Sequence, residues 1–215
     1  MTARLDSADA LHAALAALAG RDPVLRDLLA AGPPPALRRR PAGFEGLAAV
    51  VTGQQVSTAS AAAIWGRVRT GLGRVDAATV AAASDAELKA FGLSTPKVRT
   101  LRALAEAVGA GSLDLDTLSD LPAEAAHAAL VRVHGIGPWT ADVYLLFYLG
   151  HADAFPAGDL ALQEAARAAY GLAARPDARA LAGLAEAWRP WRGAAAHLLW
   201  AHYRVLKARD GAPGA

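Results

Sequence analysis

The stretch Val131-Arg-Val-His-Gly-Ile-Gly-Pro-Trp-Thr140 decides how the chain around it is expected to fold. Apolar residues recur at helical spacing up to Val133, which predicts a helix that ends at His134-Gly135, where glycine accepts a positive φ. Pro138 suits the first position of a second helix because it has no N–H group to leave unpaired. Gly135-Ile-Gly137 is therefore expected to be a tight turn. Backbone N–H groups exposed there, at a helix start, bind anions such as phosphate.

The composition limits the classes of protein and of site. The chain has 215 residues, of which 54% are hydrophobic, enough to bury a core in one or two compact lobes. It has no cysteine, which excludes disulfides and cysteine-ligated zinc or iron–sulfur centres. The histidines are scattered, so no metal site built from side chains is expected. A formal net charge of +2 is compatible with nucleic acid but does not require it.

Nothing in the sequence predicts export or a membrane span. The first residues include Asp6 and Asp9, where a signal peptide would be basic. The apolar helix expected over 138–149 has about 12 residues and is too short to cross a bilayer. We therefore expect an intracellular protein with no membrane partner, in the cytoplasm, the nucleoid or a nucleus.

Cap and breaker residues divide the rest of the chain into helices, and no segment alternates with period two, so an all-α fold is predicted. Gly32-Pro-Pro-Pro35 and Leu37-Arg-Arg-Arg40 form a linker, whose arginines either meet phosphate or are simply solvated. Helices are expected after the caps Ser7, Asp22, Ser57 and Ser84, from Phe44, from the cap-and-proline pair Thr95-Pro96, and near 159–170, 176–187 and 190–207.

Four motifs give the chain a resemblance to a known family. The hairpin is followed by Phe155-Pro-Ala-Gly-Asp159, a proline- and glycine-containing loop that ends in a carboxylate. The others are Gly53-Gln-Gln-Val-Ser57, Phe91-Gly-Leu-Ser-Thr-Pro-Lys97 and the segment 188–200, Trp-Arg-Pro-Trp-Arg-Gly-Ala-Ala-Ala-His-Leu-Leu-Trp. Together they resemble the helix-hairpin-helix superfamily of DNA glycosylases, in its alkylation-repair branch, 3-methyladenine DNA glycosylase II. We do not expect the β-rich N-terminal domain of some members, because the roughly 40 residues before Phe44 cannot build it.

The resemblance implies a single helical glycosylase unit over 1–215, built as a two-lobed bundle with the hairpin at the cleft. The expected lobes are 1–43 with 155–215, and 44–154, which holds the hairpin. It also implies a monomer that acts in base excision repair on double-stranded DNA. The reaction would be monofunctional hydrolysis of the N-glycosidic bond of an alkylated base that is flipped out of the duplex, leaving an abasic site.

Asp159 is the catalytic candidate that the family position implies. A carboxylate beside the sugar stabilises the positive charge of an oxocarbenium-like transition state. The alternative is an ordinary helix N-cap, because Gly158-Asp159 precedes the helix-forming Leu160-Ala-Leu-Gln-Glu. One carboxylate is able to serve in both ways.

Aromatic residues are implied to form the pocket for the flipped base. Alkylation at purine N3 or N7 makes the base cationic, and a cation stacks well on an electron-rich ring. The family position places Trp200 opposite Asp159 and Trp139 at the hairpin edge, with Tyr144 contributing, whereas an aromatic at helical spacing is more usually core. Val143 stands where relatives hold a tyrosine. Trp139 stands where strand-cleaving relatives hold a Schiff-base lysine, so that route of strand cleavage is excluded.

The remaining site residues are expected to contact DNA or an ion through the hairpin. The resemblance implies that N–H groups of Gly135, Gly137 and Thr140 hold a DNA phosphate and that Gln54 and Gln55 also bind DNA. Gln55 aligns with the wedge that fills the hole left by the flipped nucleotide, although it is equally explained as an ordinary helix-start residue. No cofactor is expected beyond a structural Na⁺ or K⁺, which would be held by backbone carbonyls of Val131, Val133 and Ile136.

Two other functions stay open at this point. A non-catalytic helix-hairpin-helix DNA-binding module would explain the glycine turn but neither Asp159 nor the helix of Trp200. A glycosylase of the same fold for mismatched or oxidised bases is the other alternative. The missing cysteines exclude the iron–sulfur cluster of many such enzymes, and Trp139 excludes their lysine chemistry.

Overall fold

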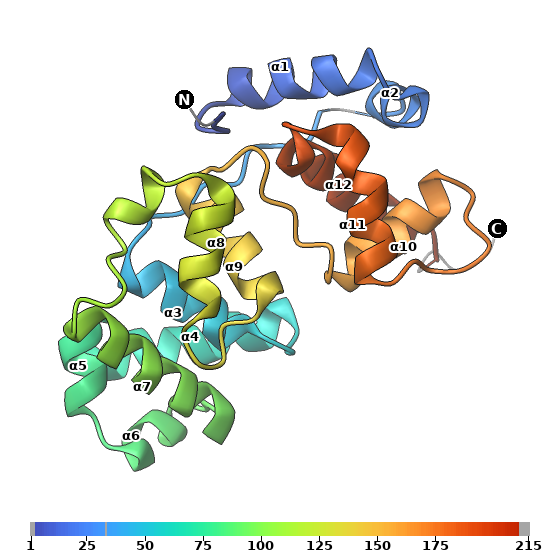
Figure 1. Cartoon of the computed structure of the whole chain (residues 1–215). Helices are drawn as coiled ribbons and strands as arrows, with labels where there is room; N and C mark the ends of the chain where they lie inside the picture. Colours follow the sequence, from blue (N-terminus) through green and yellow to red (C-terminus); the bar gives the residue numbers. More distant parts are fainter. Residues whose placement is uncertain (1–2, 33, 211–215) are drawn as a thin grey trace. The chain divides into compact units, whose positions relative to one another are not determined.

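The computed structural model describes residues 3–32 and 34–210, and helices supply the regular structure of those ranges (Figure 1). Extended pairing within them is limited to an isolated antiparallel bridge between Arg4 and His151. The predicted all-α fold class is therefore confirmed. The chain divides into two compact units, which we call unit 1 (Met1–Arg39 with Gly150–Ala215) and unit 2 (Arg40–Leu149). In the described ranges, no helix is both long and apolar enough to cross a membrane.

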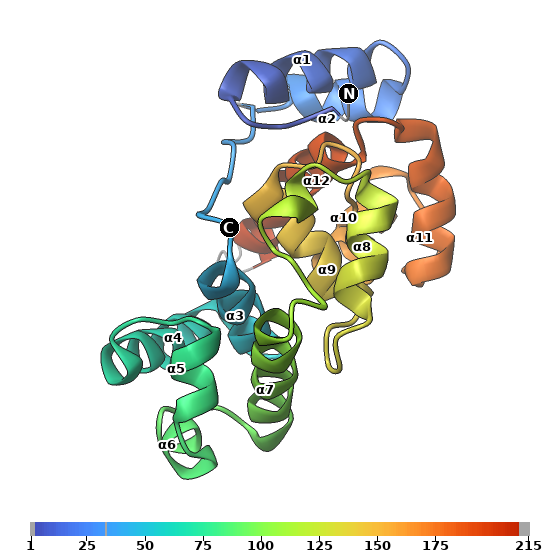
Figure 2. The ribbon, with the colours of Figure 1, turned by 60° about the vertical axis from the view of Figure 1, so that its left-hand side comes forward.

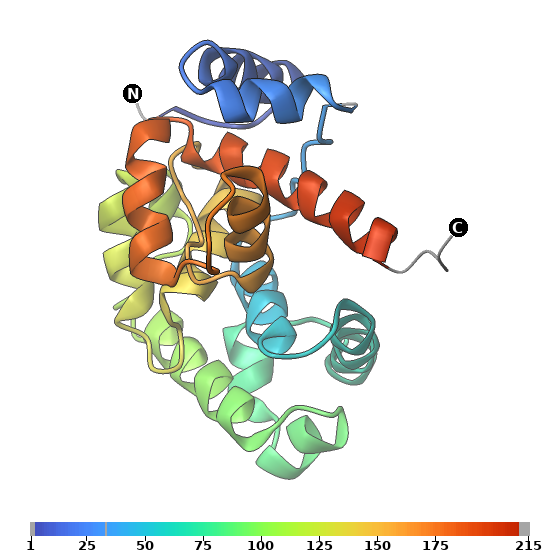
Figure 3. The ribbon, with the colours of Figure 1, turned by 90° about the vertical axis from the view of Figure 1, so that its right-hand side faces the viewer.

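Unit 1 combines the beginning of the chain with its last helices. The helices α1 and α10 both pack against the long α12, and α1 also packs against α2 (Figure 3). The caps Ser7 and Asp22 are as predicted, because the side chain of each accepts backbone N–H groups of the first turn. The elements are α1 (Ala8–Ala19), α2 (Pro23–Ala30), α10 (Leu160–Ala169), α11 (Ala178–Ala185), the 3-10 helix η3 (Glu186–Trp188) and α12 (Arg192–Asp210).

A polar contact joins distant parts of the unit 1 core. Oδ2 of Asp22 accepts hydrogen bonds from the hydroxyl of Tyr170 at 2.6 Å and from Nε1 of Trp188 at 3.1 Å. Trp188 is fully buried and meets Phe155 edge to face, with ring centroids 5.5 Å apart. Trp188, the first residue of the motif at 188–200, is therefore a core residue that anchors η3 to the start of α2.

Unit 2 holds the hairpin and the helices that support it (Figure 2). Its helix α3 packs against α4, α7 and α9, so the chain around Gly53 lies beside the hairpin. The predicted capping box of Ser84 and Glu87 is present. The elements are α3 (Phe44–Gly53), α4 (Thr58–Leu72), α5 (Ala77–Ala82), α6 (Asp85–Ala90), α7 (Thr95–Gly109), the 3-10 helix η1 (Thr117–Ser119), α8 (Ala123–Val131), α9 (Pro138–Tyr144) and the π-helix η2 (Leu145–Leu149).

Several predicted helix ends differ from the structure. The helix before the hairpin ends at Val131 rather than at His134-Gly135, because a turn over 132–135 already reverses the chain. The cap of α7 is Ser94 and not Thr95, so the proline occupies the second helical position, where its missing N–H is equally harmless. The helix after Pro138 changes to π geometry at Leu145. The last helix begins at Arg192, after the cis Arg189–Pro190 bond.

Candidate functional site

Asp159 and Trp200 form a hydrogen-bonded pair in unit 1. Asp159 is the N-cap of α10, and its Oδ1 accepts the backbone N–H groups of Ala161 and Leu162 at 3.0 and 3.1 Å. The indole Nε1–H of Trp200, on α12, donates to the same oxygen at 3.2 Å. Both side chains are half-buried, so the pair lies at the surface of the unit without being fully exposed. Three donors therefore fix the direction of one carboxylate.

The loop that carries Asp159 is held in place by its own hydrogen bonds. The backbone N–H of Asp159 donates to the carbonyl of Pro156 at 2.8 Å, and the buried side chain of Gln163 donates to the carbonyl of Ala157 at 3.0 Å. These bonds close the loop on the first turns of α10. A carboxylate on such a loop is positioned before any ligand arrives, which is the preorganisation that electrostatic stabilisation needs.

An ion-pair cluster ties the same loop to the start of α12. Arg192 donates to both oxygens of Asp153 at 2.9 Å, and each side chain is 15% exposed. The backbone N–H of Gly193 donates to the carbonyl of Ala152 at 2.7 Å, and Arg189 makes a further ion pair to Asp153. Because α12 carries Trp200, this cluster connects the two elements that bring the carboxylate and the indole together. The bidentate geometry makes the connection stiff.

His197 packs beside Trp200 and contributes no charge at neutral pH. The two rings meet edge to face, with centroids 6.4 Å apart. Burial lowers the pKa of His197 to about 4, the hydrogen bond to the carbonyl of Gly193 opposes this shift, and the charge of Arg38 adds to it. The carbonyl is only an acceptor, so Nδ1, at 2.8 Å from it, carries the single proton of the neutral ring.

The turn of the hairpin in unit 2 needs glycine at its first position for two reasons. Gly135 has φ +84°, in the left-handed region, and an added Cβ would lie 1.8 Å from Oγ1 of Thr100. The positive φ predicted for this residue is therefore confirmed. The close approach to Thr100, on α7, seats the turn against the rest of the unit.

Gln54 braces the turn from the end of α3. Its Nε2 donates to the carbonyl of Gly135 at 3.2 Å and to Oγ1 of Thr140 at 2.8 Å. Thr140 is 2% exposed, so its side chain serves this contact inside the unit. The Gln54 amide thereby holds both ends of the glycine turn, and its role at DNA stays a prediction.

Gly137 and Gln55, unlike Gly135 and Thr140, lie in open positions at the surface of unit 2. Gly137 caps α9 with an extended backbone, and an added Cβ there would meet nothing within 4 Å. Gln55 is exposed and has φ +55°, the one positive φ of a residue other than glycine in the described ranges. Backbone strain of this kind costs about 1–3 kcal/mol and gathers at functional sites.

A basic hollow of about 250 Å³ lies beside the turn. It is bordered by the turn, the end of α3 and the first turn of α7. Lys97 is buried there and donates through Nζ to the carbonyl of Thr52 at 2.7 Å, and burial lowers its pKa. Arg99 and His134 add exposed basic groups to the same lining. The side of unit 2 that carries the hairpin turn is therefore rich in hydrogen-bond donors.

The two other aromatic candidates lie in unit 2. Trp139 is half-buried in the first turn of α9. Tyr144 is fully buried and stacks on Tyr148, and its hydroxyl exchanges hydrogen bonds with the backbone of Gly43. Burial raises the pKa of Tyr144 to about 12. The structure thus corrects the expectation for Tyr144, which is a core residue at the entry to α3 rather than part of a pocket wall.

The carbonyl groups expected to hold a monovalent cation lie where α8 ends. Val131 is the last residue of α8, so its carbonyl lies past the intrahelical ladder, at the negative end of the helix dipole. The carbonyl of Val133 accepts the N–H of Ile136 at 3.0 Å and keeps a second lone pair. Neutral oxygens at a helix C-terminus suit a monovalent cation. The described residues contain no cluster of histidine, cysteine and carboxylate side chains suited to a metal.

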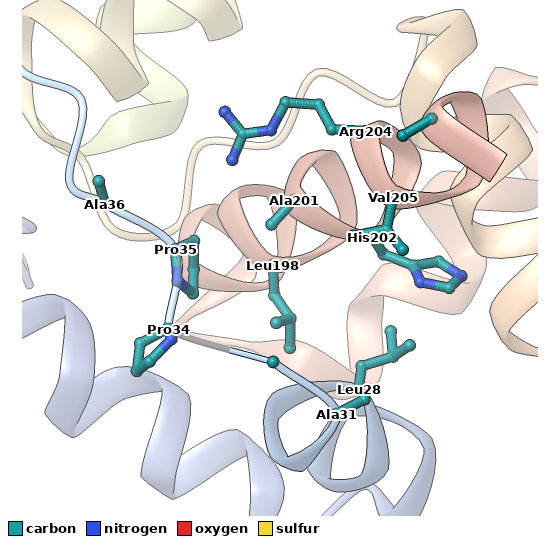
Figure 4. Close-up of a pocket in the computed structure, with 12 residues that line it drawn as sticks. Leu28, Ala31, Pro34, Pro35, Ala36, Leu198, Ala201, His202, Arg204 and Val205 are labelled. Atoms are coloured by element: carbon teal, nitrogen blue, oxygen red, sulfur yellow. The ribbon is translucent and has the colours of Figure 1, made fainter. Parts of the chain in front are cut away.

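Unit 1 also has an apolar pocket of about 440 Å³ on another face of α12 (Figure 4). Leu198, Ala201 and Val205 line it at helical spacing, whereas Trp200 points to a different side of the helix. Leu28, Pro34 and Pro35 close its other wall. Neither member of the Asp159–Trp200 pair borders this pocket, so it is separate from the candidate site.

The structure brings the predicted residues together in two groups, one in each unit. Asp159 and Trp200 meet in unit 1, while Gln54, Gly135 and Thr140 meet in unit 2. Sequence reasoning missed Arg38, whose guanidinium lies over the ring of Trp200, 5.9 Å from the centroid. The run of arginines in the linker was the only signal for it, and that run does not say which arginine meets a ring.

Comparison with known proteins identifies the family to which the chain is similar. The pattern of the HhH-GPD superfamily base excision DNA repair proteins matches residues 48–190. A Mycobacterium tuberculosis protein named "Probable bifunctional transcriptional activator/DNA repair enzyme AlkA" is 36% identical over 207 residues. The match covers 92% of this chain but 41% of that protein, so the chain spans about two fifths of its length.

Two solved structures of similar size superpose on the chain. DNA-3-methyladenine glycosidase from Bacillus halodurans matches with a TM-score of 0.80 and 28% identity, covering 95% of this chain and 93% of that one. The Schizosaccharomyces pombe 3-methyladenine DNA glycosylase in complex with abasic DNA matches with a TM-score of 0.79 and 27% identity, covering 87% and 94%. From the family match over residues 48–190, the chain belongs to the HhH-GPD superfamily of base excision DNA repair proteins.

Proposed function

We propose that this chain is a monofunctional DNA glycosylase of base excision repair. It hydrolyses the N-glycosidic bond of alkylated bases of the 3-methyladenine type, flipped out of double-stranded DNA, and leaves an abasic site. The observation that carries the proposal is the Asp159–Trp200 pair, in which a preorganised carboxylate lies at the edge of a half-buried indole. A DNA-binding module without catalysis would need Asp159 only as the cap of α10.

The role of Asp159 follows from the charge that develops during bond cleavage. As the bond from C1′ to the base breaks, its electrons leave with the base and positive charge grows on the sugar. A carboxylate held by Ala161 and Leu162 stabilises that charge without having to reorient. Water then adds to C1′ and loses a proton. Trp200 supplies a flat surface on which the base stacks while it waits for this step.

The hairpin is proposed to anchor the DNA backbone. Backbone N–H groups of Gly135, Gly137 and Thr140 would hold a phosphate, and a Na⁺ or K⁺ on the carbonyls of Val131, Val133 and Ile136 would reinforce the contact. Backbone anchoring carries no sequence information, so binding should tolerate any sequence and weaken with salt. The wedge is assigned to Gln55, which follows the end of α3, is exposed and has a left-handed backbone. We expect the protein to work as a monomer inside the cell.

The proposal excludes strand cleavage through a Schiff base. Trp139 lies at the position of the lysine that strand-cleaving relatives use, and an indole cannot form an imine with the sugar. The product is therefore an intact strand with an abasic site, which breaks only in alkali or heat.

Release of free base from methylated duplex DNA tests the proposal. Wild-type protein should release methylated purines and leave strands that break only after alkaline treatment. A covalent protein–DNA adduct trapped by borohydride during turnover would disprove the monofunctional assignment. Tight DNA binding with no base release from any alkylated duplex would favour the non-catalytic module.

A further inference from the structure

Arg38 places a positive charge over one face of the indole on which the base is proposed to stack. Its Cζ lies 5.9 Å from the centroid of the Trp200 ring, within the range of a cation–π interaction. The N–H at the edge of the same ring donates to Asp159. Trp200 therefore contacts the guanidinium of Arg38 through its ring face and the carboxylate of Asp159 through its ring edge.

The linker fixes where Arg38 can lie. The segment 34–39 joins α2 to the rest of the chain, and Pro35 within it is buried in unit 1. The charge of Arg38 also lowers the pKa of His197, which packs edge to face on Trp200. The effect of Arg38 on His197 agrees with the position of its guanidinium over the ring of Trp200. Because His197 is neutral at pH 7, it adds no charge of its own there.

Such a charge distinguishes two kinds of damaged base. When the glycosidic bond breaks, the base takes both electrons of the bond. A base methylated at N7 carries a positive charge before cleavage and leaves as a neutral molecule. An uncharged base such as hypoxanthine leaves as an anion and then takes a proton from water. A guanidinium over the stacking ring repels the first base when it binds and stabilises the negative charge of the second as it leaves.

We propose that Arg38 is a specificity-determining residue that shifts the site toward uncharged damaged purines of the hypoxanthine type and away from cationic ones. The inference rests on the proposed glycosylase function and extends it to the charge of the base. It holds whichever face of the indole the base takes. A base on the face that Arg38 covers meets the guanidinium directly. A cationic base on the opposite face competes with the guanidinium for interaction with the π electrons of Trp200.

The test compares two lesions in the same duplex sequence, one with hypoxanthine and one with 7-methylguanine. Single-turnover rate constants of base release are measured for the wild-type protein, Arg38→Ala and Arg38→Lys. The matched control is Arg26→Ala, which removes one positive charge from an exposed arginine of α2 in the same unit. Arg38→Ala should lower the rate ratio of hypoxanthine to 7-methylguanine by about 10-fold, the scale of one cation–π contact. Arg38→Lys should keep most of the ratio, and Arg26→Ala should keep all of it.

Other outcomes overturn the inference and separate it from the proposed function. An equal loss for both lesions in Arg38→Ala, reduced by added salt, would make Arg38 a DNA-backbone contact. An unchanged ratio in folded Arg38→Ala would remove it from specificity while the glycosylase function stands. A wild-type protein that releases neither base would overturn this inference, and release of 3-methyladenine from methylated duplex DNA then decides separately whether the proposed glycosylase function stands. Far-UV circular dichroism of each variant confirms that the comparison is made on folded protein.

Discussion

The hairpin turn of unit 2 and the Asp159–Trp200 pair of unit 1 present different chemical groups to a ligand. The turn presents mainly backbone, and its side chains, Gln54 and Thr140, are engaged inside the unit. The pair presents a carboxylate and an indole, so its chemistry lies wholly in side chains. Substitutions in the turn should therefore change stability or DNA affinity, whereas removing the charge of Asp159 should change the rate of base release, and this contrast separates binding from catalysis.

The largest effect is expected from Asp159→Asn. The change keeps the size of the side chain and most of its capping ability but removes the negative charge. Single-turnover base release should fall by at least ~100-fold, the scale of one preorganised stabilising group. The melting temperature and the affinity for abasic DNA should change little. A cationic base that leaves readily should show a smaller loss. If the folded variant excised bases at nearly the normal rate, Asp159 would be only a helix cap.

The turn should respond most strongly to Gly135→Ala. The new methyl group would meet Oγ1 of Thr100 while the backbone stays at φ +84°. We expect a loss of about 2–4 kcal/mol in the free energy of unfolding, from left-handed strain and overpacking together. Denaturant unfolding measures this loss. Gly137→Ala is the matched control two residues away and should be nearly neutral. Equal stabilities of the two variants would contradict the close approach to Thr100.

A histidine in each unit lets pH probe the two regions separately. The folded pKa of His197, about 4, lies below its unfolded value of about 6.5, so the unfolded chain gains the proton first on acidification. The stability that neutral His197 contributes is complete above pH 6.5 and is lost between pH 6.5 and about 4. Between pH 7 and pH 5 this loss is about 2 kcal/mol. Burial also lowers the pKa of His127, in unit 2, which predicts the same direction there.

Unfolding measured at several pH values distinguishes the two histidines. His197→Gln should flatten the fall in stability between pH 7 and pH 5. His127→Gln should flatten it less, because His127 has a side chain 30% exposed, whereas His197 is 3% exposed. A full pH dependence in His197→Gln would show that other groups govern acid unfolding.

The smallest expected effect belongs to Gly137→Asp. The added side chain enters open space, and aspartate is a good cap for α9, so folding should be unaffected or slightly improved. Its charge repels a phosphate at the turn, so DNA affinity should fall by about 10-fold, the order of one charged hydrogen bond. The slope of affinity against salt should decrease by about one phosphate. Unchanged affinity in this folded variant would remove the turn from the DNA interface.

Local rules explain which parts of this structure could be predicted. The caps Asp22, Ser84 and Asp159 are as expected because each needs only neighbours two or three residues along the chain. The end of α8 was misplaced because the turn over 132–135 is seated by Thr100, about 35 residues earlier in the sequence. The place of Tyr144 in the core depends on Gly43 in the same way.

The contacts that escaped prediction join residues far apart in the sequence. Arg38 meets Trp200 across about 160 residues, and Asp22 meets Trp188 across a similar span. Composition shows that arginine and tryptophan are present, but their pairing depends on how α12 packs against the rest of unit 1. No periodicity or motif in the sequence predicts that packing, so these contacts are seen only in the folded structure.

If Asp159 has the proposed catalytic role besides its role as a helix cap, the two roles together limit which residues can replace it. Active-site groups usually weaken the fold, so their loss is tolerated and even favoured when selection for activity relaxes. Here the same carboxylate caps α10, and most replacements would cost about 1 kcal/mol of stability. Asparagine, serine and threonine cap nearly as well, so inactive but stable descendants should carry one of these three at position 159. Sequencing this gene in populations grown for many generations without DNA-alkylating damage would show which replacements of Asp159 persist.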